Sequence, residues 1–120
     1  MSPADGDGLQ PSSAEQPLPQ PGPRMLQARA FIESHYHQPV TPTRVARHVG
    51  MATAWLQREF RRTWGETPQQ TLLNCRMQEA ERLLDAGIDP SDVAQQVGYS
   101  SARAFVADHR YWSRRRAGNE

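Results

Sequence analysis

RVARHVGMATAWLQREFRR, residues 44–62, carries five arginines against one glutamate and has a glycine near its middle. Apolar residues recur at helical spacing before Gly50, and Leu56 and Phe60 lie four residues apart after it. Glycine tolerates the left-handed backbone that a sharp turn between two helices requires. The stretch therefore predicts two helices joined by a tight turn, with a strongly basic second helix.

A second copy of this pattern begins 48 residues further along the chain. TPTRVARHVG at 41–50 and DPSDVAQQVG at 89–98 share a proline, a Val–Ala pair and a Val–Gly pair at the same places. In both copies a residue with a side-chain oxygen precedes the proline, which is typical of a helix start, and glycine marks the helix end. The repeat predicts two helix-turn-helix units.

The remaining apolar pattern completes an all-α fold. Ala28, Ile32 and Tyr36 mark the inner side of a first helix. Residues 68–86 predict one long helix of roughly 28 Å, which could hold the second helices of the two units about one DNA turn, roughly 34 Å, apart. No segment alternates as a strand would. The predicted helices span residues 25–37, 42–49, 53–64, 68–86, 90–97 and 101–113.

Composition separates a tail from the folded part. Residues 1–24 hold six prolines, three glycines and three serines without an apolar period, so we expect a disordered tail. The expected DNA-binding domain spans 25–116, with a first unit at 25–65, a linker helix at 66–87 and a second unit at 88–116. The tail has no apolar signal-peptide core, and no apolar run reaches the roughly 18 residues of a membrane span. We expect a soluble, cytoplasmic, nucleoid-associated protein without a membrane partner.

Charge is arranged in blocks although the net charge is only +1. Residues 44–62 and 103–116 are rich in arginine, whereas residues 79–92 are mainly acidic. All fourteen basic residues are arginine, which favours bidentate pairing with phosphate or guanine. Two basic blocks separated by an acidic one indicate two contact surfaces for one polyanion, although two solvated helix faces would give the same pattern.

The basic helix of the first unit has its candidate DNA-contacting face opposite its apolar stripe. Gln57 can bond adenine, Arg58 can bond guanine, and Ala54 could touch a thymine methyl. Arg61 and Arg62 lie further along the helix, where phosphate contacts are expected. The alternative is a polar face that only keeps an amphipathic helix soluble.

The corresponding face of the second unit has less capacity to read bases. Val106 and Ala107 stand where the first unit has its glutamine and arginine, and they cannot donate to base edges. Arg103 is the one evident base reader, and Arg110 is a candidate phosphate contact. This unit is therefore expected to contribute mainly phosphate contacts, which fix register but carry no direct sequence information.

No residue pattern indicates a catalytic, metal or cofactor site, and we expect no enzyme activity. His35 and His37 are two residues apart, so they do not share a helix face. Cys75 is the single cysteine, which excludes an intramolecular disulfide and a cysteine-held zinc, and we interpret it as a small packed side chain. The three tryptophans are expected in the core or at its rim: Trp55, Trp64 and Trp112.

The quoted residues resemble the DNA-binding region of the AraC/XylS family of bacterial transcription regulators over about residues 26–113. The resemblance rests on VARHVGMATAWLQREF, GETPQQTLLNCRMQEAERLL and DVAQQVGYSS. It is most specific in the middle motif, where residues stand at the family's spacing: Gly65, Thr67, Pro68, Leu72, Arg76, Ala80, Leu83 and Leu84.

The resemblance implies two helix-turn-helix subdomains on a long helix, placed in successive major grooves of double-stranded DNA as a monomer. Activators of this type also touch RNA polymerase. The base-contacting positions that it implies are Ala54, Gln57 and Arg58 in the first unit and Arg103, Ala104 and Ala107 in the second.

The end of the chain departs from the family pattern. His109 stands where the family has an aromatic core residue, Ser113 replaces another apolar residue, and RRRAGNE at 114–120 replaces a glycine and a closing helix. A degenerate copy, a truncation or a frameshifted end would each give this pattern. Residues 1–24 are too short and polar for an effector domain, so the chain resembles stand-alone members. The alternative function is a protein-interaction module that modulates another regulator or RNA polymerase.

Overall fold

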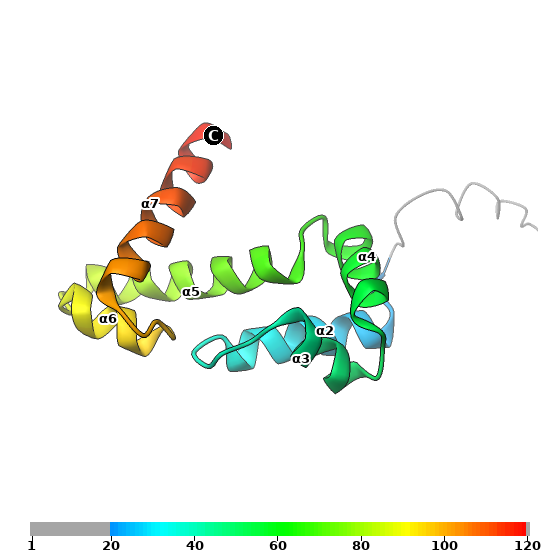
Figure 1. Cartoon of the computed structure of the whole chain (residues 1–120). Coiled ribbons are helices and arrows are strands. Elements are labelled where there is room, and N and C mark those ends of the chain that lie inside the picture. Colours follow the sequence, from blue (N-terminus) through cyan, green and yellow to red (C-terminus); the bar gives the residue numbers. More distant parts are fainter. Residues whose placement is uncertain (1–19, 120) are drawn as a thin grey trace, which may run out of the picture.

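The computed structural model describes residues 20–119, which form six α-helices and no strand (Figure 1). The all-α prediction is confirmed. Of the disordered tail expected at residues 1–24, residues 1–19 lie outside the described part, whereas Pro23 and Arg24 belong to the first helix, which corrects the expected boundary. The helices are α2 (Pro23–His35), α3 (Pro42–Val49), α4 (Thr53–Trp64), α5 (Pro68–Asp85), α6 (Pro90–Gln96) and α7 (Ala102–Asn119).

Each of the three prolines that follow a capping residue begins a helix. The Thr41 hydroxyl accepts a hydrogen bond from the Arg44 amide at 3.1 Å, which fixes the start of α3. Thr67 and Gln70 cap α5 reciprocally, with the side chain of each bonded to the backbone amide of the other. Gly50 ends α3 with a left-handed backbone, φ 71°, as the sequence predicted.

The buried apolar residues form two separate clusters, one for each helix-turn-helix unit. The first cluster joins α2, α3 and α4, and the second joins α5, α6 and α7. α5 packs against both units, so it serves as their shared scaffold. Its 18 residues correspond to about 27 Å at roughly 1.5 Å per residue. Fully buried residues include Ile32, Leu56 and Phe60 in the first cluster and Met77, Val93 and Val97 in the second.

The bounds of α2, α5, α6 and α7 differ from the sequence-based expectation, by one or two residues except at the end of α7. α2 begins at Pro23, because proline is well suited to the first helical position. α7 does not end near Ser113 but continues to Asn119. Arginine and alanine are good helix formers, and no proline follows Ser113, so nothing in this segment stops the helix. Tyr36, expected on the inner side of its helix, is only partly buried.

His109 is partly buried and forms a polar contact inside the second unit. Its Nε2 lies 2.7 Å from the Glu81 carboxylate of α5, and its ring lies near those of Phe105 and Trp112. The imidazole thus occupies an aromatic position and gains a carboxylate partner on the neighbouring helix.

The two units meet around Arg76, which lies on α5. Its guanidinium donates to the backbone oxygen of Tyr36 at 2.7 Å and to that of Gln38 at 2.9 Å, both at the end of α2. On the side of the second unit it lies 5.2 Å from the ring centre of Tyr99. The Tyr99 hydroxyl donates to Asp108 on α7 at 2.7 Å. A continuous series of contacts therefore connects the first unit with α7.

Replacing Gly50 with alanine should destabilise the protein by about 1–2 kcal/mol, because an L-residue is disfavoured at its left-handed φ. A Cβ at this position would meet no atom within 4 Å, so the cost comes from the backbone alone. Urea denaturation measures the change in the free energy of unfolding. Gly118→Ala, also in open space but inside α7, is the matched control and should not destabilise. Equal stability of Gly50→Ala and the native protein would contradict the assigned turn.

Raising the pH should weaken the fold through Tyr99. Burial, and then the hydrogen bond to Asp108, raise the pKa of Tyr99 above its ordinary value of 10.0. The unfolded chain therefore loses this proton at lower pH than the folded chain, so the stabilisation is complete below about pH 10 and is lost as the pH rises above it. The free energy of unfolding should fall less steeply between about pH 9.5 and 11.5 in Tyr99→Phe than in the native protein. Identical slopes would show that Tyr99 titrates as an exposed phenol.

Candidate nucleic-acid interface

The candidate reading face of α4 is set by what the opposite face buries. Leu56 and Phe60 are fully buried, which turns Ala54, Arg58 and Arg61 toward solvent. Gln57 lies at the edge of this face and is partly buried. The predicted base-contacting residues therefore share one accessible surface, with arginine at its centre and glutamine on its flank.

Arg58 is supported by an aromatic side chain of its own helix. Its guanidinium lies 5.6 Å from the ring centre of Trp55, which is three residues earlier and 49% exposed. Stacking of this kind favours the charged group without removing its hydrogen-bond donors. Of the two places expected for Trp55, the core or its rim, its exposure excludes the core. The three-residue spacing of Trp55 and Arg58 could have predicted this contact, because residues three apart on a helix are neighbours.

The two candidate phosphate contacts at the end of α4 are exposed. Arg62 forms only a long contact of 4.0 Å with Glu59, and its side chain is 51% exposed. Exposed pairs of this kind contribute about 0–1 kcal/mol, so Glu59 does not hold Arg62 firmly. Arg61 is also exposed. Both guanidinium groups can therefore turn toward a phosphate.

The candidate face of α7 is small, apolar and bounded by arginine. Arg103, Val106, Ala107 and Arg110 line one shallow, open hollow together with Ala102. Val106 is 40% exposed, and its side chain has no polar group that could bond a base. Such a surface can approach a groove closely and place a guanidinium at each end. Ala104, which the resemblance also implied, is exposed beside this hollow.

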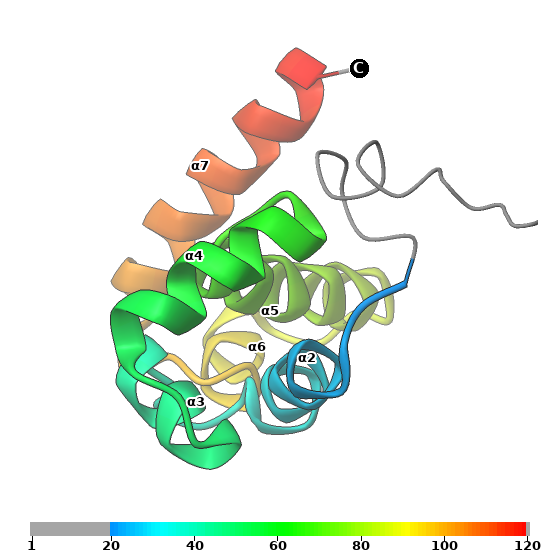
Figure 2. The same ribbon diagram turned by 90° about the vertical axis from the view of Figure 1, so that its right-hand side faces the viewer.

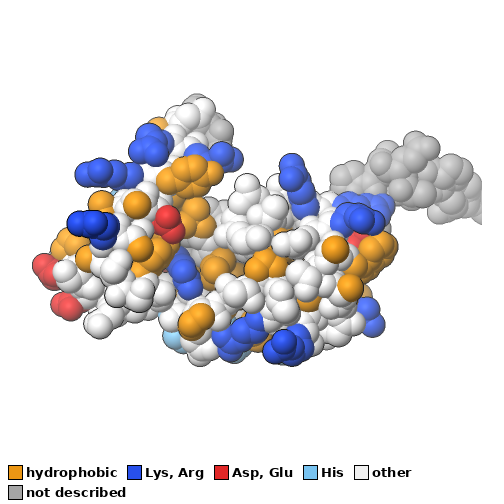
Figure 3. Space-filling model, viewed as in Figure 1, with side chains coloured by type: hydrophobic (Ala, Val, Ile, Leu, Met, Phe, Trp, Pro, Cys, Tyr) orange, Lys and Arg blue, Asp and Glu red, His pale blue; other side chains and the backbone are white. Residues whose placement is uncertain are grey.

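The two helices that carry these faces lie at opposite ends of the scaffold helix (Figure 1). α4 and α7 rise from opposite ends of α5 in Figure 1, and in Figure 2 they run nearly parallel to each other. In Figure 3 arginine side chains are spread over both ends of the visible face, where acidic groups are few. The axes of α4 and α7 therefore run in a similar direction, and the surface visible in Figure 3 carries arginine at both ends.

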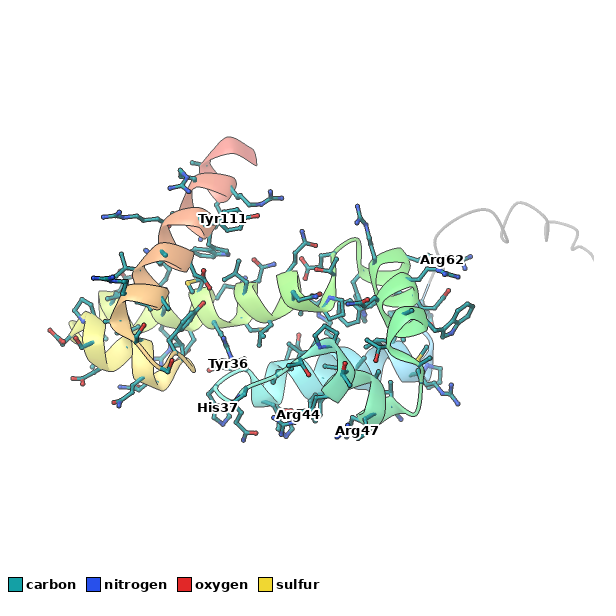
Figure 4. The ribbon with its side chains drawn as sticks, in the orientation of Figure 1. Tyr36, His37, Arg44, Arg47, Arg62 and Tyr111 are labelled. Atoms are coloured by element: carbon teal, nitrogen blue, oxygen red, sulfur yellow. The ribbon has the colours of Figure 1, made fainter. Side chains whose placement is uncertain are left out.

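Other sequence candidates have local roles. Arg44 donates to the Pro39 backbone oxygen at 2.6 Å and to the Gln38 side chain at 3.1 Å, so it fixes the loop before α3. Arg47 is exposed beside it on the same helix (Figure 4). Cys75 packs against the first core cluster, and burial raises the pKa of its thiol, as a packed side chain requires.

Two further features concern residues 20–119. Within this range, no group of three or more His, Cys, Asp or Glu side chains could hold a metal ion. None of the helices in the described part is long and apolar enough to span a bilayer.

Residues 45–116 match the model of a family described as a helix-turn-helix domain. Two curated relatives are similar to the chain. One, 31% identical over 69% of the chain, is the uncharacterized HTH-type transcriptional regulator YbfI of Bacillus subtilis. The other, 35% identical over 67% of the chain, is the probable thc operon regulatory protein of Rhodococcus erythropolis. The chain spans only 30% and 25% of the lengths of these relatives.

Solved structures show the same fold. The C-terminal domain of AraT, a response regulator from Geobacillus stearothermophilus, superposes with a TM-score of 0.74 at 24% identity, over 77% of this chain and 78% of that one. A DNA-binding transcriptional dual regulator from Escherichia coli K-12 gives 0.65 at 26% identity, over 78% and 84%. The resemblance drawn from the sequence is thereby confirmed, and the chain belongs to the AraC-type helix-turn-helix family.

Proposed function

We propose that this chain binds double-stranded DNA and regulates transcription by reading two successive major-groove segments. The observation that carries the proposal is the common orientation of α4 and α7, each of which presents an exposed, arginine-bearing face. A helix fits the major groove of B-DNA, and two helices on one side of a duplex meet the same groove about one turn, roughly 34 Å, apart. Family membership supports the same role.

α4 is the proposed principal reader. Arg58 donates to guanine O6 and N7, Gln57 bonds adenine at N6 and N7, and Ala54 lies against a thymine methyl. Contact with the Trp55 ring restricts the Arg58 guanidinium in the free protein, which lowers the entropy lost on binding DNA. Arg61 and Arg62, further along the helix, bond phosphates and fix the register of this contact.

α7 is the proposed second contact. Arg103 reaches a base edge near the start of the helix, and Arg110 reaches a phosphate one turn or more later. Its central Val106 and Ala107 select through shape and apolar contact, so this half of the site should tolerate more sequence variation. The proposed partner is DNA, bound by one copy of the chain. Contact with RNA polymerase stays an expectation from the family.

The direct test is selection of bound duplexes from a random DNA pool, followed by sequencing. The expected motif has one well-defined segment for α4 and one weaker segment about one helical turn away. Failure to enrich any motif, with a protein that remains folded and binds duplexes only weakly at low salt, would contradict sequence-specific reading.

Arg58→Ala should weaken binding to the selected site by about 1–3 kcal/mol and relax preference at one base position. The reason is that alanine removes both donors to the guanine edge. Repeating the selection with this variant measures preference, and fluorescence anisotropy measures affinity. Arg82→Ala removes the same charge from α5, where Arg82 pairs with Glu79, and should retain the motif. The same loss of preference in both variants would show that only charge matters.

Arg62→Ala should lower affinity about equally for all sequences and reduce the salt dependence of binding. Each phosphate contact contributes a slope of about −0.9 in a plot of log affinity against log salt concentration, because bound counterions are released. The slope of the variant should therefore be shallower by about one. An unchanged slope would place Arg62 away from the phosphates.

A further inference from the structure

We propose that Arg76 and Asn74 act as positioning residues that hold α4 and α7 in one arrangement and so determine which spacing of the two DNA segments is accepted. This inference rests on the proposed function and extends it from the residues that read bases to those that set their separation. Both residues lie on α5, and neither belongs to the candidate reading faces.

Arg76 forms the first link, which we call the Arg76 bridge. It consists of the Arg76 guanidinium, the Tyr36 and Gln38 backbone oxygens that it bonds, and the Tyr99–Asp108 pair on its other side. A planar guanidinium can bond two oxygens and stack on a ring at once, which an ammonium cannot. The bridge therefore joins the end of α2 to the turn before α7 through a single side chain.

The backbones of Gly98 and Tyr36 approach each other so closely that the two units have no room to shift at this junction. A Cβ added to Gly98 would lie 2.9 Å from the Tyr36 backbone oxygen and 3.1 Å from the Arg76 guanidinium. The Gly98 φ is 103°, which also favours glycine. The turn of the second unit is thus seated directly against the end of α2, and Arg76 bonds the same carbonyl that Gly98 approaches.

Asn74 forms the second link, which we call the Asn74 bridge. Its amide donates to Glu66 in the loop after α4 at 3.0 Å, and its oxygen accepts from the Trp112 indole of α7 at 2.9 Å. Glu66 also lies 3.8 Å from Arg29 of α2. Because Asn74 and Arg76 are two residues apart on one helix, their side chains leave α5 on nearly opposite sides.

Two links on opposite sides of a rod oppose both bending and rotation of the units about it. Adding one base pair between the two DNA segments shifts the second by about 3.4 Å and rotates it by about a tenth of a turn. A protein with both bridges intact cannot follow that shift without breaking hydrogen bonds. Weakening a bridge should therefore change tolerance to spacing more than it changes base preference.

The test measures affinity for a series of duplexes in which the two selected segments are separated by one base pair more or fewer than in the preferred site. For the native protein each change should weaken binding at least about tenfold. For Arg76→Ala the same change should cost less than about threefold, with base preference within each segment retained. Arg82→Ala, on the same helix with its Glu79 partner, should keep the native penalty.

Two milder variants keep the test interpretable if Arg76→Ala does not fold. Tyr99→Phe keeps the ring but removes the hydroxyl that bonds Asp108, and Asn74→Ala opens the other bridge. Both should reduce the spacing penalty while circular dichroism shows native helix content. Native penalties in all three bridge variants would overturn the inference and leave DNA reading intact. A native motif with a single segment would overturn it as well.

A measurement without DNA separates this inference from the proposed function. Spin labels at Arg62→Cys and Arg110→Cys, both exposed and in the packed parts of α4 and α7, report the separation of the two helices by pulsed electron resonance in a Cys75→Ser background. The distance distribution should be narrow in this background and clearly broader when Arg76→Ala is added. Equal widths would contradict the positioning role whether or not the chain binds DNA.

Discussion

The arrangement of the whole molecule depends on the hydrogen bonds that Arg76 makes across the junction of its two units. The last carbonyls of a helix lack partners within that helix, and a guanidinium can satisfy two of them at once. Here one oxygen belongs to Tyr36, the residue that caps the end of α2, and the other to Gln38 in the loop that follows, while the guanidinium itself extends from the scaffold helix. The same bonds that complete the end of α2 therefore attach the first unit to α5 and seat the second unit against it.

Around this junction, buried and exposed residues have different roles. Buried apolar residues decide which side of α4 and α7 faces inward, and glycines with positive φ set the direction of the turns. What remains outside is a face of arginine, alanine and one glutamine, supported by Trp55. Positive charge supplies attraction to any duplex, whereas the placement of a few donors supplies preference among sequences. Both properties follow from helix packing rather than from a preformed cavity.

The sequence predicted α3 and α4 to the residue. Thr41, Pro42 and Gly50 mark both ends of α3, and Gly65 marks the end of α4. The sequence placed the reading candidates on one face of α4, since helical periodicity fixes faces. It missed the length of α7, where no stop signal exists, and the support of Arg58 by Trp55. The Arg76 bridge and the Asn74 bridge could not be predicted from the sequence either. Contacts such as Arg76 to Tyr36 join residues 40 apart, and periodicity carries no information about such pairs.

α4 and α7 are each anchored in a hydrophobic cluster of their own, and this separation has a consequence for local opening. Amide exchange in such a molecule need not be uniform, since cooperative subglobal openings can release one cluster while the other stays closed. α7 extends six residues beyond Ser113 with exposed side chains at 114–118, so its outer turns have little to protect them. Amide protection should therefore decline along α7 toward its end. α4 is then the firmly held helix of the pair, and α7 is the one that opens locally.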